Sequence, residues 1–236
     1  MTAPGPRVQS RKVGDLTVHA IQAGGQKLDG GAMFGVVPKP LWEKRIPADD
    51  RNRIQLGMRC LLIEHPSGLI LIDTGAGNKE NAKFKDIYGL ENEGASGGTM
   101  LEDGLKEVGV TPTDIALVIN THLHFDHAGG NTRIRGEDGP LEISFPNATY
   151  IVKRGEEEVK LTGIEYKLLA YLAANHGRIL THQSILSHVW GPADADHTEY
   201  LRVYMRQLRK KLEEDPQRPQ YIHTEPGIGY RFIADE

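Results

Sequence analysis

The sequence predicts an α+β protein built from two unlike parts. Residues 1–152 are rich in glycine and contain strand-like apolar runs separated by long loops, whereas residues 153–236 contain closely spaced helix signals. Charged residues make up 25% of the chain and hydrophobic residues 39%, which is enough apolar material for a core. A length of 236 residues suits one large domain or two small ones. We expect two domains, divided between residues 152 and 153.

The composition also excludes several classes of protein. A single cysteine, Cys60, has no partner for an intramolecular disulfide and excludes a zinc site built from cysteines. The N-terminal residues lack the apolar run of a signal peptide, and no apolar stretch is long enough to span a membrane. We therefore expect a cytoplasmic protein without a membrane segment. The net charge of −4 argues against a uniformly basic nucleic-acid binder, although it leaves room for local basic patches.

In the first part, three local patterns predict regular structure. Two apolar runs, 60–64 and 69–72, flank a turn signal and predict a hairpin of buried strands. Thr99 and Glu102 form a capping box, and the apolar stripe that follows them predicts a helix. The apolar run 116–120 predicts a further buried strand, which leads directly into a histidine-rich segment.

The second part contains a start signal for each of its helices. A capping box of Thr162 and Glu165 opens the first helix. The second helix follows from Thr181, and the third opens with Asp196 as its N-cap and runs to about Glu214. Four strands complete the expected unit, paired as a small N-terminal sheet and a C-terminal hairpin: 148–152 with 157–161, and 221–224 with 229–233.

Three histidines and one aspartate follow the predicted strand 116–120: His122, His124, Asp126 and His127. Neutral imidazoles and a carboxylate are good ligands for zinc. Side chains alternate along an extended segment, so His122 and His124 point the same way and can bind one ion together. Asp126 and His127 can turn toward a second ion, and two ions can hold a bridging hydroxide. We predict a zinc site here, with Asp126 as the candidate catalytic residue. The alternative is a solvated histidine-rich loop.

Two motifs in the first part resemble the metallo-β-lactamase superfamily. They are Thr-His-Leu-His-Phe-Asp-His-Ala-Gly-Gly at 121–130 and Asp-Thr-Gly at 73–75. The resemblance covers about residues 10–152 and implies half of an αββα fold, in which two sheets lie between layers of helices. It also implies that His122 and His124 bind one zinc ion and that Asp126 and His127 bind a second.

The later metal ligands of that family have no clear counterpart in this sequence. The remaining histidines fall within the elements of the second part, and only His182 faintly resembles the last ligand. We therefore expect a truncated fold with uncovered apolar surface and a partial zinc site of reduced affinity. Asp73 has a competing interpretation, the phospho-acceptor of a receiver domain, which the Thr-Gly-Ala-Gly that follows it disfavours.

The predicted third helix of the second part has a basic side. Four apolar residues form its buried stripe: Leu201, Met205, Leu208 and Leu212. Between Tyr200 and Leu212 there is no acidic residue, and the basic residues are Arg202, Arg206, Arg209, Lys210 and Lys211. Such a helix can enter the major groove, where arginine reads guanine and its neighbours contact phosphates. A solvated basic face is the alternative.

The order of two helices, a basic helix and a terminal hairpin is that of a winged helix-turn-helix. Four motifs resemble the C-terminal DNA-binding domain of OmpR-type response regulators over about residues 154–234, and within that family they are most similar to the regulator of the high-affinity potassium-transport operon. These motifs lie at 161–169, 178–191, 204–212 and 227–232. The resemblance implies that these residues face double-stranded DNA: Arg202, Val203, Arg206, Gln207, Arg209 and Lys210. It leaves Arg231, in the wing, as a phosphate contact or a structural residue.

The two resemblances together predict a sequence-specific transcription regulator of the two-component type, preceded by an incomplete metallo-β-lactamase-like region where a receiver domain normally lies. Relatives of this kind imply a homodimer on tandem half-sites. The alternative is a zinc-dependent hydrolase of lactones, thioesters or other esters, with its missing ligands supplied elsewhere. A third possibility, a fusion whose first part has no function, predicts rapid proteolysis of that part.

Overall fold

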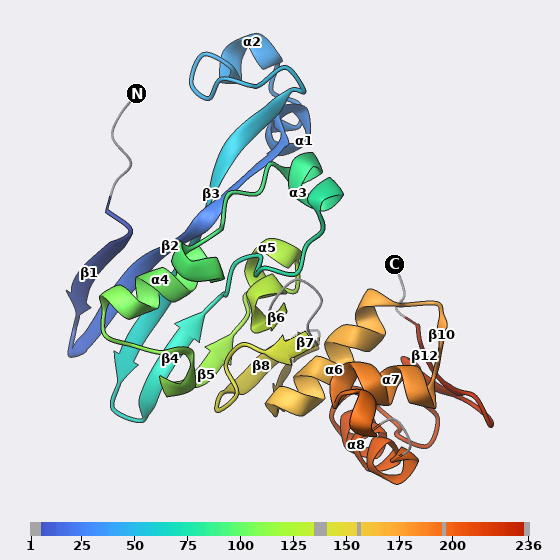
Figure 1. Ribbon diagram of the computed structural model, residues 1–236. Coiled ribbons are helices and arrows are strands. Elements are labelled where there is room, and N and C mark those ends of the chain that lie inside the picture. Colours follow the sequence, from blue (N-terminus) through green and yellow to red (C-terminus); the bar gives the residue numbers. More distant parts are fainter. Residues whose placement is uncertain (1–5, 135–140, 155–156, 195–196, 234–236) are drawn as a thin grey trace.

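The computed structural model describes residues 6–134, 141–154, 157–194 and 197–233 and confirms an α+β fold (Figure 1). The strands are β1 (Val8–Val13), β2 (Leu16–Asp29), β3 (Arg53–His65), β4 (Gly68–Ile72), β5 (Ile115–Ile119), β6 (Thr132–Ile134), β7 (Leu141–Ile143), β8 (Thr149–Arg154), β9 (Glu157–Leu161), β10 (Ile179–Thr181), β11 (Ile222–Glu225) and β12 (Gly229–Phe232). The α-helices are α1 (Gly30–Phe34), α2 (Lys39–Trp42), α3 (Ala82–Tyr88), α4 (Met100–Glu107), α5 (Phe125–Ala128), α6 (Gly163–Ala174), α7 (His182–Val189) and α8 (Thr198–Leu212).

One large sheet joins the first part of the chain to the second. Its strand order is β1-β2-β3-β4-β5-β8-β9, and β5 runs parallel to both β4 and β8 while the other neighbours are antiparallel. Strands β6 and β7 pair separately, and β10, β12 and β11 form a third sheet. Because parallel strands end at the same edge, the residues that follow β4 and β5 are brought together there.

The long hairpin of β2 and β3 was not predicted in full. The expected strand 60–64 is only the end of β3, which pairs with β2 from Thr17–Glu64 to Asp29–Arg53, with a bulge between Gln22 and Gly24. The glycines and the polar Gln26 interrupt the apolar alternation of β2, so a local pattern search misses the strand. The hairpin projects beyond the sheet and carries α1 and α2 near its tip (Figure 1).

The two faces of the large sheet differ in burial. Leu62, Leu71, Val118 and Tyr150 are successive cross-strand partners, so they share one face, and each is fully buried. Helices α4 and α6 cover this face. A Cβ placed on Gly104 of α4 would lie 2.2 Å from Ile21, so glycine permits this close approach.

The opposite face carries a row of branched aliphatic side chains that stay partly exposed: Leu61, Ile63, Ile70, Ile72, Leu117, Ile119 and Ile151. Leu61 is 37% exposed. This row is the uncovered apolar surface that half of a two-sheet sandwich is expected to leave.

The second part has the winged-helix elements that the sequence predicts. Thr162 and Glu165 form the expected capping box of α6, and Thr181 caps α7. Helix α8 begins at Thr198 with His197 as its N-cap and ends at Leu212, two residues short of the expected end, because Glu213 adopts an extended backbone. The predicted N-cap Asp196 lies outside the described residues.

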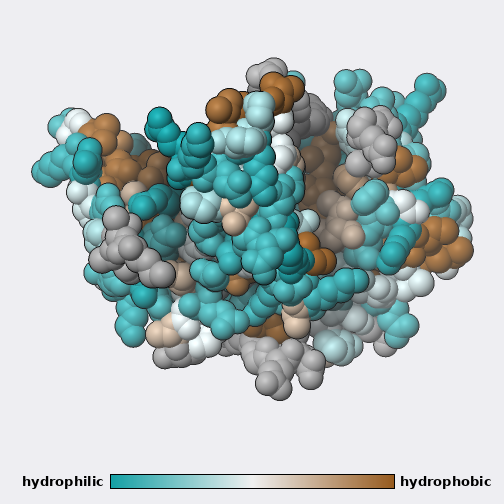
Figure 2. All heavy atoms as spheres, turned by 90° about the horizontal axis from the view of Figure 1, so that it is seen from above, coloured by the Kyte–Doolittle hydropathy of each residue, from teal (hydrophilic) through white to brown (hydrophobic). Residues whose placement is uncertain are grey.

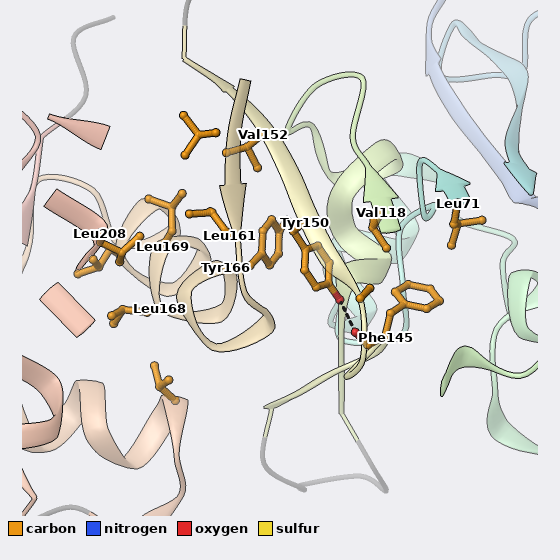
Figure 3. Packing of buried hydrophobic residues seen from close by; sticks show 14 of the residues in the cluster. Leu71, Val118, Phe145, Tyr150, Val152, Leu161, Tyr166, Leu168, Leu169 and Leu208 are labelled. Carbon is orange, nitrogen blue, oxygen red and sulfur yellow. Dashed lines mark hydrogen bonds between the residues drawn. The ribbon is translucent and has the colours of Figure 1, made fainter. Parts of the chain in front are cut away.

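The junction between the parts needs a correction. Strands β8 and β9 pair as expected, but they do not form a separate small sheet, because β8 also pairs with β5 and so extends the large sheet. The expected boundary at residues 152 and 153 therefore lies inside β8. Tyr150 of this strand stacks on Tyr166 of α6, with ring centroids 4.6 Å apart, and its hydroxyl donates to the Phe145 carbonyl (Figure 3). One continuous core results, with Leu71 and Val118 on one side of the tyrosines and Leu168 and Leu208 on the other (Figure 3).

None of the helices in the described part of the chain is long and apolar enough to cross a membrane.

Candidate metal centre and nucleic-acid interface

The histidine-rich segment forms a compact cluster that spans the turn after β5 and helix α5. One possible ligand atom from each of His122, Asp126 and His127 lies within 4.8 Å of the others. His124 lies just outside this group, with its ring centroid 4.6 Å from that of His122. The structure thus brings the four predicted ligands together in one cluster, and their assignment to two separate ions stays a prediction.

Asp73 holds His127 in place from the neighbouring strand. It follows β4 with a φ of +57° and accepts hydrogen bonds from the backbone N–H and the hydroxyl of Thr121, at 2.9 and 3.0 Å. Its Oδ2 lies 2.7 Å from Nδ1 of His127. When Nδ1 donates to this carboxylate, Nε2 keeps a lone pair for a metal ion, and that atom lies 3.5 Å from Asp126 Oδ2.

Gln26 is a residue of this site that the sequence analysis missed. Its Nε2 donates to Oδ2 of Asp126 at 2.6 Å, although the two residues are 100 positions apart. Gln26 is only 3% exposed, and its Oε1 has no hydrogen-bond partner among the described residues. Gln26 lies in β2, which the pattern of apolar residues does not predict. No local sequence motif therefore indicates that Gln26 belongs to this site.

The donor set fits a divalent ion such as zinc. Two imidazoles and one carboxylate are a common set of three protein ligands, which leaves a position open for water. Burial lowers the pKa of His122, and the neighbouring His127 and His124 lower it further, so the ring stays neutral and able to bind metal at neutral pH. Asp126 and His127 line an open cleft of about 520 Å³ beside Met58 and Arg59 of β3.

No later histidine joins this cluster within the part of the chain that the structure describes. His182, the faint candidate, opens α7 in the winged-helix part and packs edge-on against Tyr230, with ring centroids 5.6 Å apart.

Helix α8 separates the apolar stripe from the basic side as the sequence predicts. The four expected stripe residues are its buried residues. The exposed side presents five of the six helix residues expected to face DNA: Arg202, Val203, Arg206, Gln207 and Lys210. Arg202 pairs with Glu199 at 3.1 Å on the surface, a contact that is weak in water.

The other two arginines of the predicted DNA-contact set, Arg209 and Arg231, contact other residues of the protein. The guanidinium of Arg209 donates to the Ile222 carbonyl at 2.6 Å and to the Thr224 hydroxyl at 2.8 Å, and it lies over the Tyr230 ring. These contacts fasten α8 to the wing. Arg231 forms an ion pair with Glu225 at 2.7 Å across the wing hairpin. Both arginine side chains therefore stabilise the wing hairpin of β11 and β12.

Lys211 also turns inward, although it belongs to the basic run of α8. Its ammonium lies 2.7 Å from the carboxylate of Glu165, which is 2% exposed, and donates to the Lys160 carbonyl. Glu165 also accepts from the Thr162 backbone in the capping box. The pair ties α8 to the start of α6, while the Lys211 side chain stays 35% exposed.

Two family models match the chain in the order that the sequence suggested. The model of the metallo-beta-lactamase superfamily matches residues 58–181, and the model of the transcriptional regulatory protein C-terminal domain matches residues 155–232. The two matches overlap at 155–181. In this stretch, β9 is the last strand of the large sheet, and α6 is the first helix of the winged-helix unit and packs on that sheet.

Similar proteins support both assignments. The KDP operon transcriptional regulatory protein KdpE of Escherichia coli is 51% identical over 92 residues, which are 39% of this chain and 41% of that protein. KdpE of Mycobacterium tuberculosis is 50% identical over 84 residues, which are 36% of this chain and 37% of that protein. The chain thus spans about two fifths of the length of these curated relatives.

A solved structure matches the longer region. The crystal structure of a probable metal-dependent hydrolase from Staphylococcus aureus is 32% identical, with a TM-score of 0.54, over 80% of this chain and 58% of that chain. The chain therefore belongs to the metallo-beta-lactamase superfamily, and its C-terminal part is an OmpR-type transcriptional regulatory domain.

Proposed function

We propose that this protein is a sequence-specific DNA-binding transcription regulator and that residues 153–236 recognise its operator. The observation that carries this proposal is the outer side of α8, where five predicted DNA-facing residues are exposed beside a fully buried apolar stripe. A basic helix with exposed side chains matches what the major groove requires. The division at residues 152 and 153 is proposed as functional only, since β8 runs through it.

The exposed residues of α8 would have different tasks. Arg206 and Gln207 lie mid-helix and have side chains that can read base edges, whereas Arg202 and Lys210 suit phosphate contacts. Arg209 and Arg231 would act indirectly, because their guanidinium groups fasten the wing. We also propose that two copies bind tandem half-sites of double-stranded DNA, each placing one α8 in the major groove.

Selection from a random-site DNA library, followed by affinity measurement on the selected site, tests this proposal. Arg206→Ala is expected to weaken binding to that site by about 1–3 kcal/mol, or roughly 5- to 150-fold. Arg11→Ala, at an exposed position on β1, serves as the control and should leave the affinity unchanged. Failure to enrich any sequence, or equal affinities for the Arg206 and Arg11 variants, would overturn the proposal.

A second candidate function is zinc-dependent hydrolysis of lactones, thioesters or other esters. The gathering of three donor atoms favours it, because Asp126 and His127 of this group line an open cleft, where Arg59 could attract an anionic substrate. A bound zinc ion would supply Lewis-acid activation of a carbonyl. His122, Asp126 and His127 would hold it, with His124 as an additional ligand, and Asp126 would remain the candidate catalytic residue.

Metal analysis combined with turnover separates the two functions. If hydrolysis is the function, the purified chain should hold at least one tightly bound zinc ion and hydrolyse a lactone or thioester. His127→Ala should then abolish both zinc binding and turnover. The regulator proposal expects weak zinc binding and no turnover while operator binding persists. Turnover without operator binding would make the hydrolase the better account.

A further inference from the structure

We propose that a groove between α6 and the first part of the chain binds a small amphipathic monocarboxylate, with its carboxylate at Lys79 and its apolar body along α6. Two adjoining cavities, of about 600 and 360 Å³, share Lys79, Thr132, Ala170 and Ala174 as lining residues, so they run into each other. Viewed from above, the surface is hollowed between the two parts, and hydrophobic residues line the hollow (Figure 2).

The walls of the larger cavity are mostly apolar. Ile134 and Leu141 come from the first part, and Ala170 and Ala174 from α6. Tyr171 and His188 also line this cavity, and their rings stack with centroids 3.8 Å apart. Burial and the nearby charge of Lys167 lower the pKa of His188, so its imidazole is neutral at neutral pH. A volume of about 600 Å³ is in the range of pockets that hold small organic ligands.

Among the described residues that line the larger cavity, Lys79 is the one that carries a full charge. Its ammonium donates to the Gly129 carbonyl, and within the described residues no carboxylate oxygen forms an ion pair with it. Burial lowers the pKa of Lys79, and the Glu80 carboxylate partly opposes that shift. Glu80 lines only the smaller cavity. An ammonium with spare donors beside an apolar cavity is complementary to a carboxylate that carries an apolar chain.

The groove places such a ligand between the two parts of the molecule. One wall belongs to α6 and α7 of the winged-helix unit, and the other to the segment that follows the histidine cluster. The smaller cavity extends the groove to Leu123 and Phe125, which lie inside that cluster's loop and helix. This binding site does not depend on the proposed function, because its test measures binding of the small molecule alone.

Calorimetric titration of the full chain with decanoate tests the proposal, with 1-decanol as the uncharged comparison. We expect one decanoate per chain and much weaker binding of the alcohol. Lys79→Met should raise the Kd at least about tenfold, because it removes a charge-assisted hydrogen bond, and Lys79→Arg should restore most of the affinity. Lys83→Met, at an exposed position on α3, is the matched control and should change nothing.

A second variant tests the apolar part of the groove independently. Ala174 is exposed at the end of α6, so Ala174→Phe can fold while its ring fills the shared section of the groove. It should abolish decanoate binding without lowering the thermal unfolding temperature. Three results would overturn the proposal: no decanoate binding, equal binding of decanol and decanoate, or a Kd that neither Lys79→Met nor Ala174→Phe changes.

Discussion

The β8–β9 end and the centre of the large sheet show how differently the two parts of this molecule are stabilised. At the β8–β9 end, Tyr150 packs between the sheet and α6, and the core continues into the winged-helix unit. At the centre, the sheet is covered on the face of Leu71 and Val118, while the row that includes Leu61 stays partly exposed. The winged-helix unit thus closes one side of the sheet without replacing the missing second layer.

The two candidate sites differ in the same way. The exposed residues that we propose to read DNA all lie on α8, so one helix positions them. The metal cluster depends on contacts between distant segments, such as Gln26 with Asp126 and Asp73 with His127. A site on one helix tolerates changes elsewhere in the fold, whereas a site assembled across a sheet depends on that sheet. The following predictions test this contrast.

The largest expected effect comes from the residue that joins the two parts. Tyr150→Ala should lower the free energy of unfolding by about 3–5 kcal/mol, the range for deleting a buried aromatic side chain. Leu61→Ala, on the exposed face of the same sheet, should cost less than about 1 kcal/mol. Denaturant unfolding, followed by fluorescence and circular dichroism, measures both. Equal losses would mean that the two faces are equally buried.

Arg209 should affect stability more than its exposed neighbours on α8 do. Arg209→Ala removes charge-assisted hydrogen bonds to Ile222 and Thr224, which should cost about 1.5–3 kcal/mol. Arg206→Ala should change the stability by less than about 0.5 kcal/mol while it weakens DNA binding. Thermal unfolding and DNA titration of both variants provide the check. A stable Arg209 variant with weak DNA binding would instead make Arg209 a direct contact.

Asp73 should tune the metal site without being a ligand. Asp73→Asn keeps the shape of the side chain and suits the positive φ, but it weakens the hold on Nδ1 of His127. Zinc affinity should fall by roughly 10- to 100-fold, as is typical for partners of metal ligands. Competition with a chelating dye measures this, and Asp15→Asn, at an exposed position, is the control. Unchanged affinity would remove Asp73 from the site.

An α-helix in each part opens with a capping box of threonine and glutamate, and these two boxes offer a matched pair. Thr99→Ala opens the cap of α4, and Thr162→Ala opens the cap of α6. Each substitution should lower the free energy of unfolding by about 1 kcal/mol. Because the core is continuous, both variants should shift the same unfolding transition. Two separate transitions, each moved by only one variant, would show that the parts unfold independently.

Local signals account for most of what the sequence predicted. Capping boxes at Thr99 and Thr162 and the apolar stripe of α8 depend on residues three or four positions apart, so the helices could be placed. The full length of β2 and the role of Gln26 could not, because they depend on pairing with distant strands. Arg209 looked like its neighbours in sequence, and only the position of the wing shows that its guanidinium is already engaged.

The most direct test of the account is the ratio of affinities of the full chain for its selected DNA site and for a scrambled duplex at physiological salt. If the free side of α8 reads sequence, the selected site should bind at least about 10³-fold more tightly. Arg206→Ala should lower that ratio, and Arg11→Ala should not. A ratio near one for the unmodified chain would contradict the claim that this protein recognises a specific DNA sequence.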